Sequence, residues 1–197
     1  EHFQPDANRL ASRVARAFLG VRLDCAECHD HPFDVWKQQD FQRLAAFFGS
    51  TRQSLRGIRD TKETFAVEDA QTGKSRVVEC GVPFVPELLK ERGAARARLA
   101  AWVTHPENRA FARATANRAW ALMFGRPLVE PIDSVPPHGE VPAALELLAD
   151  DFAAHGYDLR RMLVIIASTQ AFRLDSRLEE SDDLSKHTAA WAVFPLT

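Results

Sequence analysis

The sequence predicts a mainly α-helical protein, with five or six helices packed as an irregular bundle and a small β-hairpin inserted between two helical parts. Two observations predict this class. Apolar residues recur at helical spacing over most of the chain, whereas the stretch TFAVEDAQTGKSRVVECGVPFVP alternates apolar and polar residues around a turn. The length of 197 residues is sufficient to bury a core without disulfide bonds.

The first two helices are expected on either side of a cysteine-rich stretch. One is predicted from Pro5 to about Leu19, where apolar residues recur at helical spacing among arginines. Pro32 interrupts the chain, and a second, strongly apolar helix is predicted from Trp36 to Phe48. We expect Gly49 to end this helix in a left-handed conformation.

The hairpin is predicted as strands at residues 65–67 and 76–80, on either side of a Gln-Thr-Gly-Lys turn. Helical periodicity then returns in AARARLAAWV, RAFARATANRAWALMFG, AALELLADDFAAHG and LRRMLVIIASTQAF, and the proline-rich EPIDSVPPHGEVP is a loop. Gly125 is expected to end a helix, and Asp158 to cap one. The chain therefore divides into a cysteine-motif module at 1–55, a connecting segment with the hairpin at 56–93, a helical module at 94–175 and a truncated tail at 176–197.

Charge and hydropathy narrow the range of partners. The chain carries 25 Lys and Arg against 27 Asp and Glu, a formal charge of −2, so nucleic acid is not expected as a partner. No apolar run approaches the roughly 20 residues that a bilayer span needs, and EHFQPDANRL lacks the pattern of a signal peptide. Because the chain begins without methionine, we expect it to be a piece of a longer protein.

The stretch LDCAECHDHPFDVW holds two of the three cysteines. Cys25, Cys28 and His29 form C-x-x-C-H, the pattern for covalent attachment of c-type haem. Two thiols at this spacing can reach both vinyl groups of one porphyrin, and the following histidine can bind the iron as an axial ligand. Haem c is therefore the expected cofactor. Asp30, Asp34 or a backbone carbonyl is expected to accept a hydrogen bond from the other ring nitrogen of His29.

A low-spin electron-transfer haem needs a sixth iron ligand from another segment. Met123 and Met162 are the first candidates, although Met162 lies on the apolar face of its helix and is also expected in the core. The other candidates are histidines: His105, His138 and His155. His31 is too close to His29 to reach the opposite face of the haem, and an open sixth position is a further alternative.

Other interpretations of the cysteine stretch stay open. Zinc or iron could be held by a cluster of Cys25, Cys28, His29, His31 and Cys80, although a second C-x-x-C half is missing. The two cysteines could instead form a disulfide or be buried thiols without any cofactor. A hydrolytic centre made of the motif's histidines and aspartates lacks a nucleophile and an oxyanion donor, so no catalytic residue and no enzymatic function is predicted.

Two long stretches resemble known families. FLGVRLDCAECHDHPFDVWKQQDFQRLAAFF resembles the C-terminal part of the planctomycete cytochrome-like domain two, whose signature includes the C-x-x-C-H-D-H-P-F-D block. LAAWVTHPENRAFARATANRAWALMFGRPLVEPIDSV and LELLADDFAAHGYDLRRMLVIIASTQAFRLDS resemble planctomycete surface domain one, which follows it in the same polypeptides. Together these resemblances cover nearly the whole chain.

The resemblance implies Cys25, Cys28 and His29 as haem residues, with an accompanying block of Asp30, His31, Pro32, Phe33 and Asp34. It also implies export to the periplasm or cell surface, where a disulfide between the cysteines would be stable. Leu122 departs from the family, whose members commonly carry histidine there, so a ligand at that position is not expected.

The predicted function is a c-type haem-binding module for electron transfer or haem sensing within a larger exported surface protein. Its partner would be a redox protein or another domain of the same polypeptide. The alternative is a non-enzymatic scaffold or interaction domain, in which the motif forms a disulfide or a structural metal site with zinc, or holds no cofactor.

Overall fold

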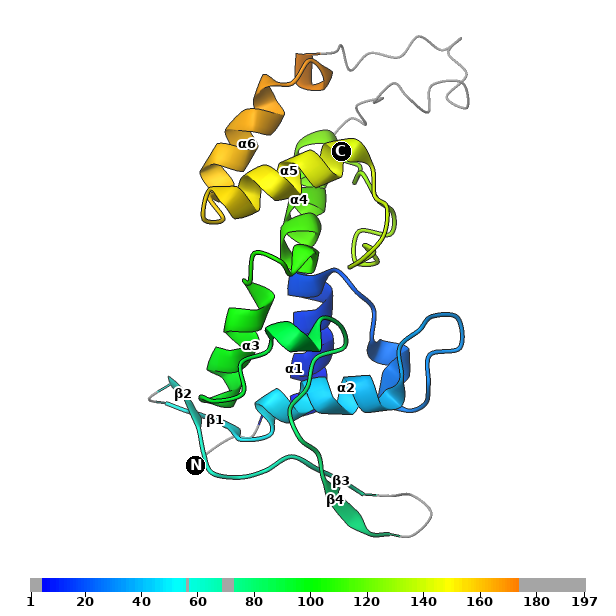
Figure 1. Ribbon diagram of the computed structural model, residues 1–197, viewed down its shortest axis with the longest axis vertical. Coiled ribbons are helices and arrows are strands. Elements are labelled where there is room, and N and C mark those ends of the chain that lie inside the picture. Colours follow the sequence, from blue (N-terminus) through cyan, green and yellow to red (C-terminus); the bar gives the residue numbers. More distant parts are fainter. Residues whose placement is uncertain (1–4, 56, 69–72, 174–197) are drawn as a thin grey trace.

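A computed structural model describes residues 5–55, 57–68 and 73–173. Within these ranges, six α-helices and two small antiparallel sheets form an elongated molecule (Figure 1). The prediction of a mainly α-helical fold with a hairpin insertion between two helical parts is confirmed. The predicted tail at 176–197 and the turn residues Gln71 and Thr72 lie outside the described ranges.

The N-terminal helix is formed as predicted. Helix α1 spans Ala7–Val14 and continues as a π-helical turn over Ala15–Leu19. Asp6 caps its start, since its carboxylate accepts hydrogen bonds from the backbone N–H groups of Asn8 and Arg9. Gly20 ends the turn with φ +67°, and a Cβ on Gly20 would lie only 2.9 Å from Cβ of Ala114. Glycine therefore allows both the left-handed conformation and the close approach of two helices.

The second helix has the predicted position but a different end. Helix α2 spans Gln38–Ala45 and continues as a 3-10 turn over Ala46–Phe48. The expected left-handed cap at Gly49 is wrong, because Gly49 has a right-handed φ of −59°. A Cβ there would lie 2.5 Å from Cβ of Phe65. Close packing against Phe65 therefore explains the glycine.

Two hairpins follow α2. Strand β1 (Thr51–Ser54) pairs with β2 (Gly57–Asp60), and this hairpin was not predicted. Strand β3 (Ala66–Glu68) pairs with β4 (Ser75–Val77), with Val67 opposite Arg76. The predicted hairpin is therefore confirmed, with a shorter second strand.

The four C-terminal helices are confirmed close to their predicted positions. Their bounds are α3, Ala95–Val103; α4, Arg109–Phe124; α5, Ala143–Ala154; and α6, Leu159–Ser168. Gly125 ends α4 in a left-handed conformation, with φ 74°. The Asp158 carboxylate caps α6 by accepting a hydrogen bond from the backbone N–H of Arg161. None of the described helices is both long enough and apolar enough to cross a membrane.

The buried side chains form two hydrophobic cores that meet along α4. The N-terminal core gathers α1, α2, the segment around Phe84, and α3, whose Trp102 is fully buried. The C-terminal core joins α4, α5 and α6 around residues such as Leu145 and Ile166. Phe111 packs against both cores. Helix α3 therefore packs with the N-terminal helices although it lies within the 94–175 segment.

Hydrogen bonds and ion pairs connect the N-terminal part of the molecule to α4 and the loop that follows it. The Arg118 guanidinium on α4 donates hydrogen bonds to the backbone carbonyls of Arg16 and Ala17 within the π-helical turn. Arg16 and Arg22 both form ion pairs with Asp133 in the loop between α4 and α5. These contacts hold the 130–142 loop beside the chain segment that enters the cysteine motif.

Candidate functional site

The cysteine motif lies on the surface in a short 3-10 helix, Asp24–Glu27, between α1 and α2. Leu23 and Ala26 are fully buried and anchor this turn to the N-terminal core. Cys25 and Cys28, on either side of Ala26, are both exposed and are free thiols. The turn therefore presents the two sulfur-bearing side chains to solvent.

The ring of His29 is held by the backbone. Its Nδ1 lies 2.7 Å from the carbonyl oxygen of Asp30. Because a carbonyl can only accept a hydrogen bond, Nδ1 carries the proton in this contact, and the neutral ring then has its lone pair on Nε2. His29 is also exposed, so Nε2 is available as a metal ligand.

Asp30 ties the motif to the first turn of α2. Its carboxylate accepts a hydrogen bond from the backbone N–H of Gln38 (3.0 Å) and pairs with Lys37 Nζ (3.2 Å). The hydrogen bond from Gln38 and the contact with Lys37 lower the pKa of Asp30 below its usual value. The Gln38 side-chain amide also donates to the carbonyl oxygen of Cys28, at 2.9 Å.

Lys37 and Gln38 were not among the predicted site residues. The sequence carries little signal for them, because Lys37 at the N-cap position has no side-chain acceptor and only Asp40, three residues later, can complete half of a capping box. In the structure the Asp40 carboxylate accepts from the backbone N–H of Lys37, at 2.9 Å.

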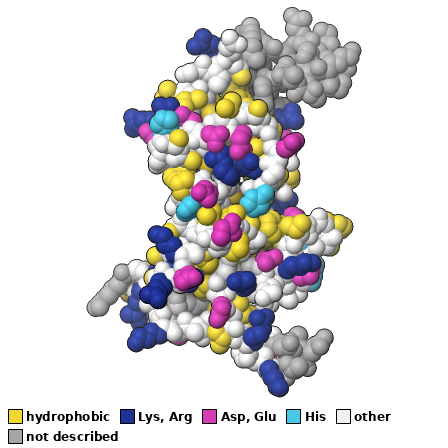
Figure 2. All heavy atoms as spheres, in the orientation of Figure 1, with side chains coloured by type: hydrophobic (Ala, Val, Ile, Leu, Met, Phe, Trp, Pro, Cys, Tyr) yellow, Lys and Arg dark blue, Asp and Glu magenta, His cyan; other side chains and the backbone are white. Residues whose placement is uncertain are grey.

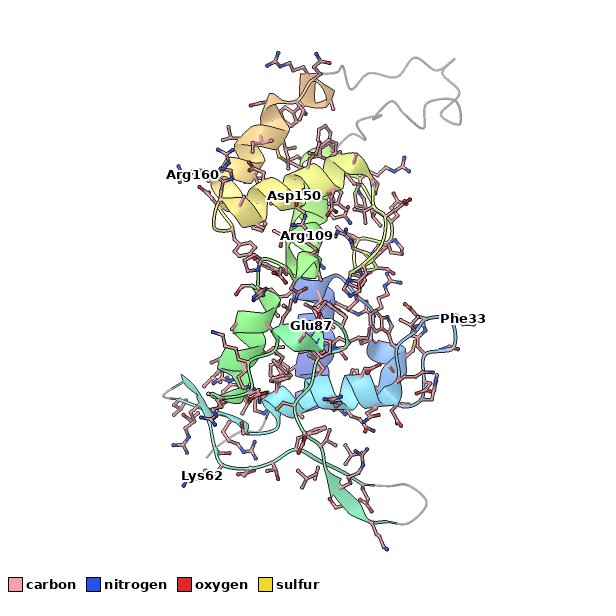
Figure 3. The ribbon with its side chains drawn as sticks, viewed as in Figure 1. Phe33, Lys62, Glu87, Arg109, Asp150 and Arg160 are labelled. Atoms are coloured by element: carbon pink, nitrogen blue, oxygen red, sulfur yellow. The ribbon has the colours of Figure 1, made fainter. Side chains whose placement is uncertain are left out.

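The rest of the motif is a loop closed at its base. His31 N–H donates to the carbonyl oxygen of Trp36 (2.8 Å), and the Trp36 side chain is buried. Asp34 accepts a hydrogen bond from the backbone N–H of Val35. Between these points Phe33 is 94% exposed and projects away from the helices (Figure 3).

The residues of the alternative metal cluster do not gather at one point. Among the residues described, no group of three or more His, Cys, Asp or Glu side chains is placed to hold a metal ion. Cys80 is partly buried against the N-terminal core, and this burial raises the pKa of its thiol.

The two methionine candidates lie in the other half of the molecule. Met162 is 1% exposed in the C-terminal core, and Met123 packs against the same core. His155, the C-cap of α5, contacts Asp151, and His105 accepts from the backbone N–H of Glu107. Neither methionine therefore belongs to the hydrophobic core that holds the motif.

A cavity of about 400 Å³ opens beside the motif loop. Its walls come from distant segments: Val21 and Arg22, residues 34–36 of the loop, Pro83 and Phe84, and residues 134–138. His138 lies here, with its ring 5.3 Å from that of Phe84. Cys25, Cys28 and His29 are not part of these walls, so the cavity adjoins the cysteine turn without enclosing it.

Charged residues hold the segments that line the cavity in place. Asp133 is held by Arg22 and Arg16, whose charges and hydrogen bonds outweigh the effect of burial and lower the pKa of Asp133. The buried Arg113 donates to the backbone carbonyls of Pro136 and Gly139. Elsewhere on the face shown in Figure 2, basic and acidic side chains are interspersed.

Comparisons with known proteins give two family matches. Residues 1–53 match the family model described as PSCyt2, Protein of unknown function (DUF1549). Residues 95–196 match the model described as PSD1, Protein of unknown function (DUF1553). The order of the two agrees with the order predicted from the resemblances. No curated protein and no solved structure matches the chain.

Proposed function

The chain belongs to the PSD1 family and carries a PSCyt2 segment ahead of it, and we propose from its cysteine motif that it is a c-type haem-binding module of a larger exported surface protein. The module serves electron transfer or haem sensing. The observation that carries the proposal is the pairing of two exposed free thiols with the adjacent His29, whose Nδ1 is occupied by the Asp30 carbonyl.

The donor set fits the requirements of a c-type haem. Cys25 and Cys28 would form the thioether bonds, and both are accessible to an attachment enzyme. His29 would bind the iron through Nε2. When bound, the haem supplies one-electron redox chemistry.

The protein's own part is to orient the histidine. The Asp30 carbonyl fixes the tautomer of the His29 ring, and Lys37 and Gln38 fix Asp30 through its carboxylate. These contacts would keep the His29 ring in one orientation toward the iron. Because the motif is exposed, one edge of the haem would stay accessible to a partner.

The partner is a redox protein or another domain of the same polypeptide. Met123 and Met162 pack with the C-terminal core, so either would have to leave it to reach an iron at His29. Of the histidine candidates, His138 lines the cavity beside the motif loop and would need no such rearrangement of the C-terminal core.

A second candidate function is a non-enzymatic scaffold without haem. One observation favours it: the motif loop is closed by protein contacts alone, from Gln38 to Cys28 and Asp30 and from His31 to Trp36. In an oxidising compartment Cys25 and Cys28 could then form a disulfide.

The visible spectrum of the chain, secreted together with the haem-attachment machinery, distinguishes the two functions. Haem binding predicts a Soret band in the wild type and a lost or altered band in His29→Ala. His31→Ala is the matched control and should keep the wild-type spectrum. A colourless wild-type protein would favour the scaffold, and a Soret band unchanged by His29→Ala would contradict His29 as the iron ligand.

A further inference from the structure

The tip of the motif loop presents an aromatic side chain to solvent. Phe33 is 94% exposed and Val35 is 74% exposed, and both belong to the loop rather than to a core. Phe33 is fixed through its backbone, since its N–H donates to Nδ1 of His31 at 3.2 Å. Burying an apolar ring that is exposed to water at a loop tip in an apolar site lowers the free energy of the system.

An apolar groove of about 250 Å³ lies elsewhere on the same molecule. Its lining comes from α1, its π-helical continuation, α3 and the start of α4, together with Phe48. The residues that define it are Val14, Phe18, Leu99, Ala100, Val103 and Phe111. Phe18 is 46% exposed here, so the groove is open to solvent.

The groove and the loop tip match in size and charge. An apolar cavity of about 150 Å³ can bind benzene, so a groove of about 250 Å³ can take a phenyl ring. Arg96 lines the groove and uses Nε for its contact with Asp60, which leaves other N–H groups of its guanidinium for an acid. Asp34, next to Phe33, is exposed and acidic.

A chain does not place this tip in its own groove. Helix α3, which forms one wall of the groove, lies on the opposite side of α1 from the motif loop (Figure 1). The loop tip can therefore reach such a groove only on another copy of the chain.

We propose that the Phe33 loop tip of one copy docks in the α1/α3 groove of a second copy, with Asp34 facing Arg96. Because the two contacting surfaces differ, the association is head-to-tail and can extend beyond a dimer. It does not depend on haem.

Sedimentation velocity of the 197-residue chain over a range of concentrations tests this association. We expect the average mass to rise with concentration. Phe33→Ala should weaken the association by about tenfold or more, because a buried aromatic anchor dominates a small interface. Ala100→Trp, which fills the groove from the exposed face of α3, should weaken it similarly.

The control variant is Leu55→Ala, which removes another fully exposed apolar side chain outside the groove and should leave the association unchanged. Circular dichroism verifies that all three variants are folded. A chain that stays monomeric to about 1 mM, or an association that either Phe33→Ala or Ala100→Trp leaves intact, overturns the proposal.

Discussion

His29 and Asp30 are adjacent in sequence and are joined by a contact of 2.7 Å between the imidazole Nδ1 and the backbone carbonyl oxygen. The same aspartate uses its carboxylate to hold the start of α2. One residue therefore links the direction of the histidine ring to the position of a helix. This link makes the motif a preorganised ligand rather than a free loop.

The three thiols should differ in reactivity. Cys25 and Cys28 are exposed, whereas Cys80 is partly buried and its thiol pKa is raised by burial, so less of it is thiolate near neutral pH. Reaction of the reduced, haem-free chain with a disulfide reagent should show two fast thiols and one slow one. Cys80→Ser should remove only the slow phase. Three equal rates would contradict the placement of Cys80.

Asn117 should be essential for the stability of the C-terminal half. Its fully buried side chain donates to the carbonyl oxygen of Val129 and accepts from the N–H of the same residue, both at 2.9 Å. Asn117→Ala leaves both backbone groups unpaired and should lower the free energy of unfolding in urea by about 2–3 kcal/mol. Arg126→Ala, on an exposed ion pair with Glu130, is the control and should cost less than about 1 kcal/mol.

Gly49→Ala should destabilise the protein. With a right-handed φ of −59°, an alanine here would ordinarily be neutral or stabilising. The added Cβ would instead lie within 3.0 Å of Cβ, Cα and N of Phe65, so a backbone segment must move. We expect a loss of about 1–3 kcal/mol in urea unfolding. A gain in stability would show that Phe65 does not pack on Gly49.

The ion pairs of Asp133 should raise the free energy of unfolding near neutral pH, and this contribution should be lost at acidic pH. Burial alone would raise the pKa of Asp133, but Arg22 and Arg16 outweigh it and hold the pKa below the usual value of 3.8. A lowered carboxyl pKa gives stability that is present above the unfolded-state pKa and is lost as the pH falls through the folded-state pKa.

Urea unfolding of the wild type and Asp133→Asn at several pH values checks this. The wild type should be more stable near neutral pH, and the difference should shrink once the pH falls below about 4. The exposed Glu140 of the same loop provides the control variant, Glu140→Gln. A difference that stays constant down to about pH 2 would contradict the role of the ion pairs.

Periodicity placed the first helix correctly, but it was based on Leu10, Val14, Ala17 and Phe18, which are partly buried or exposed. The fully buried face of this helix is formed by Ala11, Ala15 and Leu19. Periodicity missed the β1–β2 hairpin because β2 is exposed along its whole length, so no apolar alternation marks it. The end of α2 was misjudged for another reason. Gly49 is required by a contact with Phe65, sixteen residues later, and no local pattern reports such a contact.

The part of the candidate site that was predictable from the sequence is the part formed by residues close together in the chain. Cys25, Cys28 and His29 are adjacent in sequence, so their spacing alone indicated their possible use. The cavity beside them was not predictable, because it needs the contact between residues 21–36 and 134–138 that Asp133 maintains. The burial of Met162, in contrast, was expected from its place on the apolar face of its helix, and the side chain is 1% exposed in the C-terminal core.

The intact mass of the chain, secreted together with the c-type haem-attachment machinery, tests the central claim most directly. The account predicts an added mass of one haem in the wild type and in Cys80→Ala, and no added mass in Cys25→Ala/Cys28→Ala. An unmodified wild-type mass, under conditions that load a control cytochrome, would contradict it.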